Sequence, residues 1–325
     1  MINTLWALGK RLDVEGIPSP FSRLKQSRSY ADLSGAREDL QRIAAAILKD
    51  GVPEAVHPLV VGLTGTGNVS RGAQEILSLL PLETVSPEAL GAVVHDRARS
   101  RQRVYQVVFG ESDMAESLTE GAAFDLDDYY RRGKDGYRGV FERYADHLTV
   151  LVNCIYWDYR YPRLLTIDQC RRLWGAGRQP RLKVIGDISC DVNGSIECTV
   201  KATEPGNPVY VYDPATGRAT DGFEGHGPVM MAVDILPAEI PRDASVDFSR
   251  VFRSGDVDAR LVENVEAGVE RHGLAATGGT GGEHQAVRGA HQAFDLGHLL
   301  GPETALVQGQ HIAAQRQDAH HQVFA

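Results

Sequence analysis

The stretch "VVGLTGTGNVSRGAQEIL", residues 60–77, constrains the fold more than any other part of this sequence. An apolar, β-prone run enters a turn that contains Gly65 and Gly67, and a helix-forming segment follows directly. Strand, glycine turn and helix in this order form the first unit of a dinucleotide-binding fold. The first glycine permits the tight turn, the second lets the backbone approach a pyrophosphate, and the third position needs a small side chain. Ser70 occupies that third position, so the sequence predicts a pyrophosphate-binding loop here.

Strand and helix patterns alternate on both sides of this loop. Helical periodicity runs through "LSGAREDLQRIAAAILKDG" and "TIDQCRRLW", whereas "RVYQVVF", "TVLVNCIYW" and "RLKVIGDIS" have the composition of buried strands. This order predicts an α/β fold with a doubly wound, mostly parallel Rossmann-type sheet over residues 31–215. Further strand candidates follow in "PVYVYDP" and "GPVMMAVDILP".

Charge and cysteine content limit the class of protein. Lys and Arg number 34 and Asp and Glu number 43, and the net charge of -9 argues against general binding to nucleic acid or to an anionic membrane. No run approaches the roughly 18 apolar residues of a membrane-spanning helix. The four cysteines form no C-x-x-C pair, which favours reduced, buried thiols and a cytoplasmic location.

The last part of the chain, residues 271–325, is rich in Gly, Ala, Gln and His. Seven of the 11 histidines lie there, which raises the alternatives of a metal site and of a flexible tail. No cysteine or carboxylate constellation accompanies these histidines, so we expect a tail, disordered in part, and no metal.

A second group of polar residues follows two of the predicted core strands. Asp187, Ser189 and Asp191 follow one strand, and Asn153 ends another, directly before Cys154, Ile155 and Tyr156. Ligands of open α/β sheets bind beyond the carboxyl ends of the strands, so these residues are expected to face the cofactor. The alternative is that the two aspartates only cap loops and that Tyr156 belongs to the core.

Whether the cofactor carries a 2′-hydroxyl, as in NAD, or a 2′-phosphate, as in NADP, is harder to predict. An acid about 20 residues after the glycine turn usually binds the ribose of NAD, and Glu83 lies near that place. Arg97, Arg99, Arg101 and Arg103 follow and would suit a 2′-phosphate, but they also suit a solvated basic face. Both NADP and NAD remain open from these residues.

Several stretches together resemble the lysine 2-oxoglutarate reductase portion of the aminoadipic semialdehyde synthase family, which is related to saccharopine dehydrogenase and more distantly to alanine dehydrogenase. The matching segments are "WALGKRLDVEGIPSPFSRLKQ", "GTGNVSRGAQEILSLLP", "LVNCIYWDYRYPRLLT", "GDISCDVNGSIE" and "VDILPAEIPRDAS", within about residues 1–253. The resemblance implies an NADPH-dependent enzyme of lysine degradation. Its substrates would be lysine and 2-oxoglutarate, and reduction of their imine would give saccharopine.

The resemblance also implies the site residues. The glycine-turn segment, the end of one core strand and the end of another would bind the cofactor, as Gly65, Gly67, Asn68, Val69, Ser70, Asn153, Cys154, Ile155, Gly186, Asp187, Ile188 and Ser189. By the same resemblance Asp191 would face the substrate, and Tyr156 is expected there from its place after the strand that ends at Asn153.

The family's acid–base Lys and His belong to a substrate domain on the N-terminal side, and no position here matches them. Residues 1–30 are therefore expected to be a remnant of that domain and a linker, and residues 216–270 to be a segment that returns toward it. A separate N-terminal substrate domain is the expected partner. The alternative function is a dinucleotide-binding module without catalysis.

Overall fold

The computed structural model describes residues 1–254. Residues Met1–Ala244 form one compact unit, and the chain continues into a second unit, Ser245–Ala325. The predicted tail at residues 271–325 lies outside the described residues. The predicted boundaries near residues 30 and 215 remain predictions.

The first unit is built on an eight-stranded sheet. Six neighbouring strands are parallel, and two antiparallel strands complete one side. The order across the sheet is β2 (Leu82–Thr84), β3 (Val104–Phe109), β1 (Val60–Thr64), β6 (Val150–Asn153), β7 (Val184–Asp187), β10 (Val229–Met231), β8 (Val209–Asp213) and β9 (Arg218–Asp221). The prediction of an α/β fold with a mostly parallel Rossmann-type sheet is confirmed.

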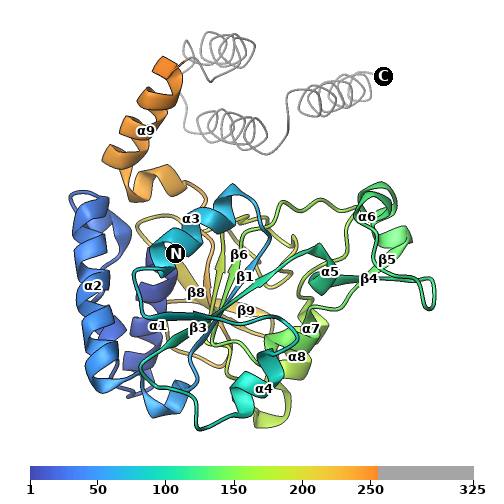
Figure 1. Cartoon of the computed structure of the whole chain (residues 1–325), viewed down its shortest axis with the longest axis horizontal. Helices are drawn as coiled ribbons and strands as arrows, with labels where there is room; N and C mark the ends of the chain where they lie inside the picture. Colours follow the sequence, from blue (N-terminus) through green and yellow to red (C-terminus); the bar gives the residue numbers. More distant parts are fainter. Residues whose placement is uncertain (255–325) are drawn as a thin grey trace. The chain divides into compact units, whose positions relative to one another are not determined.

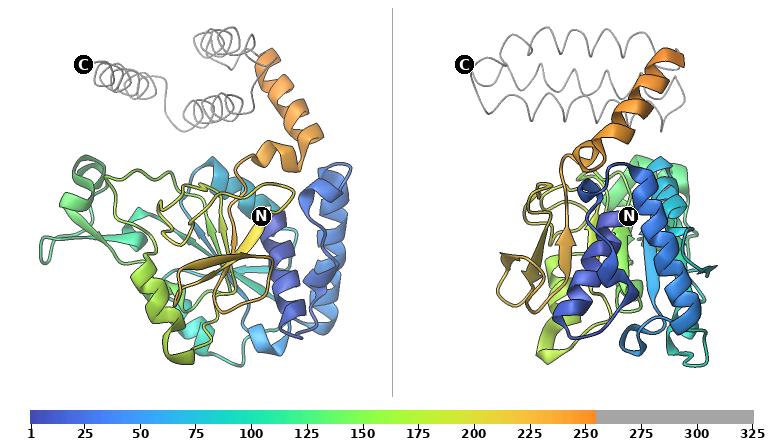
Figure 2. Two further views of the ribbon diagram at one scale, coloured as in Figure 1. Left: turned by 180° about the vertical axis from the view of Figure 1, so that it is seen from behind. Right: turned by 90° about the vertical axis from the view of Figure 1, so that its left-hand side faces the viewer.

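Helices cover both faces of this sheet (Figures 1 and 2). Successive strand side chains point to opposite faces, so Val61 and Leu63 of β1 pack in one apolar cluster and Val60 in the other. The first cluster includes α1 (Ile2–Val14), α2 (Leu33–Asp50) and α3 (Asn68–Leu77). The second includes α4 (Leu90–His95), α7 (Glu142–Ala145) and α8 (Ile167–Trp174). Both faces of the central strands are therefore buried.

The amino-acid sequence accounts for the bounds of α2. Asp32 caps its start by accepting a hydrogen bond from the Gly35 N–H across 3.2 Å. Gly51 ends the helix with a φ of +78°, a conformation that favours glycine. The predicted apolar stripe faces the core, where its buried members are Ala36, Leu40, Ile43 and Ile47.

The polar segment 111–143 contains α5 (Glu111–Met114), α6 (Leu126–Arg132) and a small antiparallel sheet. Its strands are β4 (Ala115–Ser117) and β5 (Tyr137–Gly139). Three residues are too few to display an alternating pattern, so the sequence contained no usable signal for this pair.

Short 3-10 helices and one further α-helix complete the described residues. They are η1 (Pro20–Arg23), η2 (Ser27–Ser29), η3 (Glu54–Val56), η4 (Gly133–Asp135), η5 (Gly175–Gly177), η6 (Leu236–Glu239) and α9 (Pro241–Ser254). Within residues 1–254, no helix combines the length and the apolar character that crossing a membrane requires.

Candidate functional site

The glycine turn lies between β1 and α3, at the carboxyl edge of the sheet. Gly65 has a φ of +83°, and a Cβ there would lie 3.1 Å from Ile155 Cγ2. Its N–H donates to the carbonyl oxygen of Phe109 across 2.9 Å, which fixes the turn to the end of β3. Gly67 is the N-cap of α3, and no side chain caps this helix. The first N–H groups of α3 can therefore serve an anion.

Ser70 meets the steric need of the third position in the turn. Its side chain is fully buried in the first turn of α3, and its Oγ accepts a hydrogen bond from Gln74 Nε2 across 3.1 Å. A larger side chain would separate α3 from the sheet because protein interiors are close-packed. The serine is thus a small residue in a position that demands one.

Asn153 connects three strand ends by hydrogen bonds. Its Oδ1 accepts from Thr64 Oγ1, at the end of β1, across 2.9 Å. Its Nδ2 lies 2.8 Å from Asp187 Oδ1, 2.8 Å from Ser195 Oγ and 3.0 Å from Ser189 Oγ. The ends of β1, β6 and β7 are therefore held together by one buried amide.

Asp187 is part of this network and is only 1% exposed. Its Oδ2 accepts from Thr199 Oγ1 across 2.5 Å. Burial raises the pKa of this carboxyl group, and the hydrogen bonds from Thr199, Asn153 and Ser189 partly oppose the increase. The structure thus places the Asp187 side chain inside the edge of the sheet, where it joins two strands.

The other predicted cofactor residues follow the same two strands. The Ile188 N–H donates to the Asn153 carbonyl across 3.0 Å, and Ser189 Oγ donates to the Ile155 carbonyl across 3.1 Å. Gly186 instead faces α1, because a Cβ there would lie 2.3 Å from Thr4 Oγ1. The need for glycine at position 186 is explained by this helix contact.

The cysteines behave as small apolar residues in the described part of the chain. Cys154, Cys170 and Cys198 are buried, and none of the four cysteines forms a disulfide bond. Burial raises the pKa of Cys154 to about 12, so its sulfur stays a thiol near neutral pH.

The two residues predicted to face the substrate lie outside the buried network. Tyr156 is 63% exposed, and Asp191 is exposed as well. Partial burial of its hydroxyl group raises the pKa of Tyr156, with smaller contributions from acids that include Asp158 and Asp191. Trp157 supports its own loop, since its Nε1 donates to the Pro162 carbonyl across 3.1 Å. A role for Tyr156 and Asp191 at the substrate stays a prediction.

Comparison with known proteins identifies the relatives of this chain. Alpha-aminoadipic semialdehyde synthase of Arabidopsis thaliana is 37% identical over 264 residues, 78% of this chain and 24% of the relative. The mitochondrial enzymes of that name from Bos taurus and Mus musculus are 31% and 32% identical over 261 residues, 76% of this chain and 28% of each relative. The chain belongs to the alpha-aminoadipic semialdehyde synthase family. It spans about a quarter of the length of the curated relatives it matches. No protein-family model matches the sequence.

Three hydroxyl residues of the edge network were missed in the sequence. Thr64 ends an apolar strand, and Ser195 and Thr199 lie in a loop after β7, so neither periodicity nor spacing connects them with Asn153. The only usable signal was that Thr64 is the polar residue at the end of a buried strand, directly before the glycine turn.

The four arginines at residues 97–103 do not gather at the carboxyl edge. Arg97 donates to the His57 carbonyl and Arg101 to the Val52 carbonyl, both before β1 begins. Arg99 pairs with Glu83 across 2.6 Å. These contacts agree better with the predicted basic surface than with a site that binds a phosphate group.

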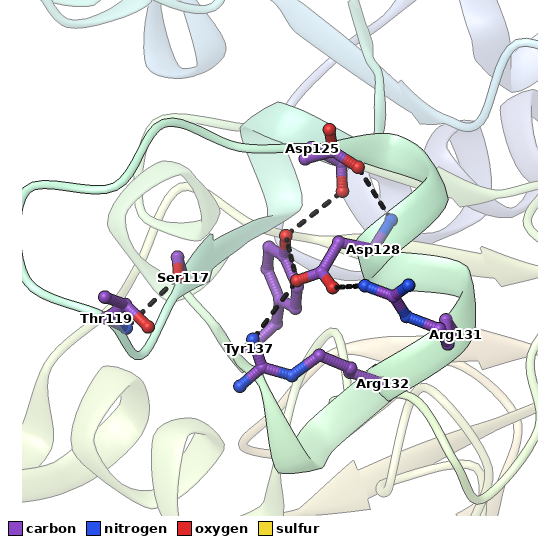
Figure 3. Close-up of polar contacts among 7 residues, drawn as sticks. All are labelled: Ser117, Thr119, Asp125, Asp128, Arg131, Arg132 and Tyr137. Atoms are coloured by element: carbon purple, nitrogen blue, oxygen red, sulfur yellow. Dashed lines mark hydrogen bonds and ion pairs between the residues drawn. The ribbon is translucent and has the colours of Figure 1, made fainter.

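Two surface hollows in residues 1–254 are lined by residues that do not belong to the carboxyl edge of the sheet. One is lined by His95, which ends α4, by Asp146 and His147, which precede β6, and by Arg178, which precedes β7. The other lies beside α6, where Asp128 pairs with Arg131 and Arg132 and accepts from the Tyr137 hydroxyl (Figure 3). Because the acidic and basic side chains beside α6 already pair with one another, the glycine-turn edge is the better candidate site.

Proposed function

We propose that this chain binds a nicotinamide dinucleotide at the carboxyl edge and belongs to an oxidoreductase of lysine degradation. The reaction we propose is the reduction of the imine of lysine and 2-oxoglutarate to saccharopine. The uncapped start of α3 behind the positive-φ Gly65 carries the cofactor part of this proposal. The names of the relatives support the pathway.

The residues present fit a dinucleotide. The N–H groups in the first turn of α3, with Asn68, Val69 and Ser70, would bind the pyrophosphate, and Gly65 and Gly67 leave room for it. The segments 153–155 and 186–189 would border the nicotinamide half, because they lie at the ends of β6, which pairs with β1, and of β7, which pairs with β6. The bound cofactor would supply the hydride for the imine carbon.

The edge network offers hydrogen bonds but no evident proton donor. Its side chains are Thr64, Asn153, Asp187, Ser189, Ser195 and Thr199, which include neither lysine nor histidine. Reduction of an imine to an amine also requires a proton at nitrogen. We therefore propose that a substrate domain on the N-terminal side, in the same or a separate chain, supplies the acid–base groups.

An assay with lysine, 2-oxoglutarate and reduced cofactor tests the enzyme proposal. The purified chain would be assayed alone and mixed with a substrate domain taken from a full-length relative. We expect consumption of reduced nicotinamide, detected by its absorbance, that needs both substrates and increases with the added domain. Absence of turnover in both samples contradicts the saccharopine-forming reaction.

A dinucleotide-binding module without catalysis is the second candidate function, favoured by the absence of Lys and His from the network. Calorimetry distinguishes it from the enzyme: the module binds a dinucleotide and shows no turnover with any added domain. If neither NADPH nor NADH binds, both candidate functions are wrong.

The resemblance implies NADPH as reductant, and NADH remains the alternative. We also propose a cytoplasmic location, supported by four cysteines that form no disulfide bond. The word "mitochondrial" in the names of the Bos taurus and Mus musculus proteins describes those proteins.

A further inference from the structure

Two histidines lie side by side at the amino edge of the sheet. His95 ends α4, before β3, and His147 lies between α7 and β6. Because β3 and β6 are parallel to β1, the segments that lead into them meet at the edge opposite the glycine turn (Figure 1). The two imidazole rings are 6.0 Å apart between centroids, at 74° to each other. They line one hollow, and neither belongs to the seven histidines of residues 271–325.

Hydrogen bonds select the same tautomer in both rings. His95 Nδ1 lies 2.7 Å from the Gly91 carbonyl oxygen, and His147 Nδ1 lies 3.1 Å from the Arg143 carbonyl oxygen. A carbonyl oxygen can only accept, so each Nδ1 carries the proton and donates it. The lone pair of the neutral imidazole is then on Nε2. Histidines that bind a metal ion through one ring nitrogen are held in this way, because the other nitrogen donates to a carbonyl or a carboxylate.

The two Nε2 atoms are available to one ligand. Neither forms a hydrogen bond or an ion pair within residues 1–254. A Cβ at Gly91 would lie 3.8 Å from His147 Nε2, so this atom lies near the turn of α4 whose carbonyl binds His95. An ion about 2.1 Å from both Nε2 atoms would bring the ring centroids to about 5 Å, which requires a movement of about 1 Å. The His95 side chain is exposed and has room for that movement.

The charged side chains of the hollow do not exclude a cation. Arg178 pairs with Asp146 across 2.8 Å, so their charges compensate each other. Arg181 donates to the carbonyl oxygens of Val56 and Pro58, which precede β1. No group of three His, Cys, Asp or Glu side chains in the described part of the chain could hold a metal ion, so water must complete the coordination. Imidazole suits Zn²⁺, Ni²⁺ and Cu²⁺, whereas Mg²⁺ and Ca²⁺ prefer oxygen ligands.

We propose that His95 and His147 form a binding site for a divalent transition-metal ion, with Zn²⁺ as the probe. The ion would link the end of α4 to the segment between α7 and β6. With two protein ligands and open positions for water, binding is reversible and weaker than in a closed site of four protein ligands. The inference does not depend on the proposed function, because the site lies at the opposite edge of the sheet from the glycine turn.

Carbethoxylation of the full chain, mapped on its peptides by mass spectrometry, tests this proposal. Diethyl pyrocarbonate modifies an unprotonated imidazole nitrogen, so the peptides report His95 and His147 separately from the histidines of residues 271–325. Zn²⁺ or Ni²⁺ at several times the dissociation constant should slow the modification of both residues at least about fivefold. Mg²⁺ at the same concentration should not. His226, which lies elsewhere in the described residues, is the internal reference and should react at an unchanged rate.

Single variants distinguish one shared site from two separate ones. His95→Gln should abolish most of the Zn²⁺ protection of His147, and His147→Gln that of His95, whereas His226→Gln should leave both protected. The comparison of ions in the unmodified chain needs no variant, so a folding defect cannot remove the test. The proposal is overturned by equal protection from Mg²⁺, by protection from inorganic phosphate in place of Zn²⁺, by protection of one histidine that survives loss of the other, or by protection confined to residues 271–325.

Discussion

The side-chain amide of Asn153 donates to Asp187 Oδ1 across 2.8 Å and joins the ends of β6 and β7. The same side chain accepts from Thr64, the last residue of β1 before the glycine turn. The turn and the two segments that would border the nicotinamide therefore share one buried support. Its integrity affects both the stability of the fold and the shape of the candidate site.

Replacement of Asn153 by alanine should destabilise the protein strongly. The change removes the hydrogen bonds that Asn153 makes with the buried side chains of Thr64, Asp187 and Ser195, and we expect the free energy of unfolding to fall by about 3 kcal/mol. Urea unfolding provides the measurement. Asn207→Ala is the matched control, since Asn207 donates to Asp221 at an exposed position and should matter little. Equal stability of the two variants would show that the network is not structural.

The buried carboxyl group of Asp187 should give a pH-dependent difference between the protein and its Asp187→Asn variant. Its pKa in the folded protein is raised above the ordinary 3.8. At pH values between 3.8 and this raised pKa, the folded state therefore binds more protons than the unfolded state. Its contribution to the free energy of unfolding is fully present below pH 3.8 and is lost as the pH rises through the raised pKa. Asparagine removes this titration; its one accepting oxygen can keep the bond from Asn153 Nδ2, and its amide N–H would donate to Thr199 Oγ1 in place of the bond that Asp187 Oδ2 accepts.

Unfolding at several pH values measures that difference. The stability of the unmodified protein relative to Asp187→Asn should decline with rising pH. Asp221→Asn is a control of opposite sign, because hydrogen bonds from Lys201 and Asn207 lower the pKa of Asp221 and its contribution is lost as the pH falls. A relative stability of Asp187→Asn that does not change with pH would contradict the raised pKa.

Gly65→Ala should impair both the turn and dinucleotide binding. The φ of +83° costs an alanine about 1 kcal/mol, and its Cβ would lie 3.1 Å from Ile155 Cγ2. We expect at least a tenfold loss of dinucleotide affinity in a calorimetric titration. Gly72→Ala is the control in α3: its Cβ meets nothing within 4 Å, and it should stabilise the helix by about 0.5–1 kcal/mol. Normal binding by Gly65→Ala would argue against the turn as the pyrophosphate site.

Gly186→Ala should expose the coupling between β7 and α1. A Cβ at position 186 would lie 2.3 Å from Thr4 Oγ1, so we expect a destabilisation of about 2 kcal/mol. Thr4→Ala alone should have a small effect, because the Thr4 hydroxyl is buried without a hydrogen-bond partner in the described residues. The double variant should recover part of the lost stability in a double-mutant cycle. Additive effects of the two changes would contradict the contact.

Local patterns in the sequence were sufficient to predict the main helices and strands. The apolar run before Gly65, the helical stripe of residues 36–47 and the buried strands ending at Asn153 and Asp187 all appear in the structure as predicted. Each depends on backbone preferences and burial within a few residues, so each can be seen in one segment alone. The grouping of these strand ends at one edge follows from their parallel direction.

The sequence by itself determined the α/β class, the glycine turn and the two strand ends beside it, because these follow from periodicity and from the conformational needs of short segments. Only the tertiary structure decided that β3 is the neighbour of β1 and that β2 lies beyond it at the edge of the sheet. It also decided that Asp187 is buried among Asn153 and Thr199. Strand order and side-chain partners depend on packing between segments far apart in the chain, and a one-dimensional pattern does not contain that information.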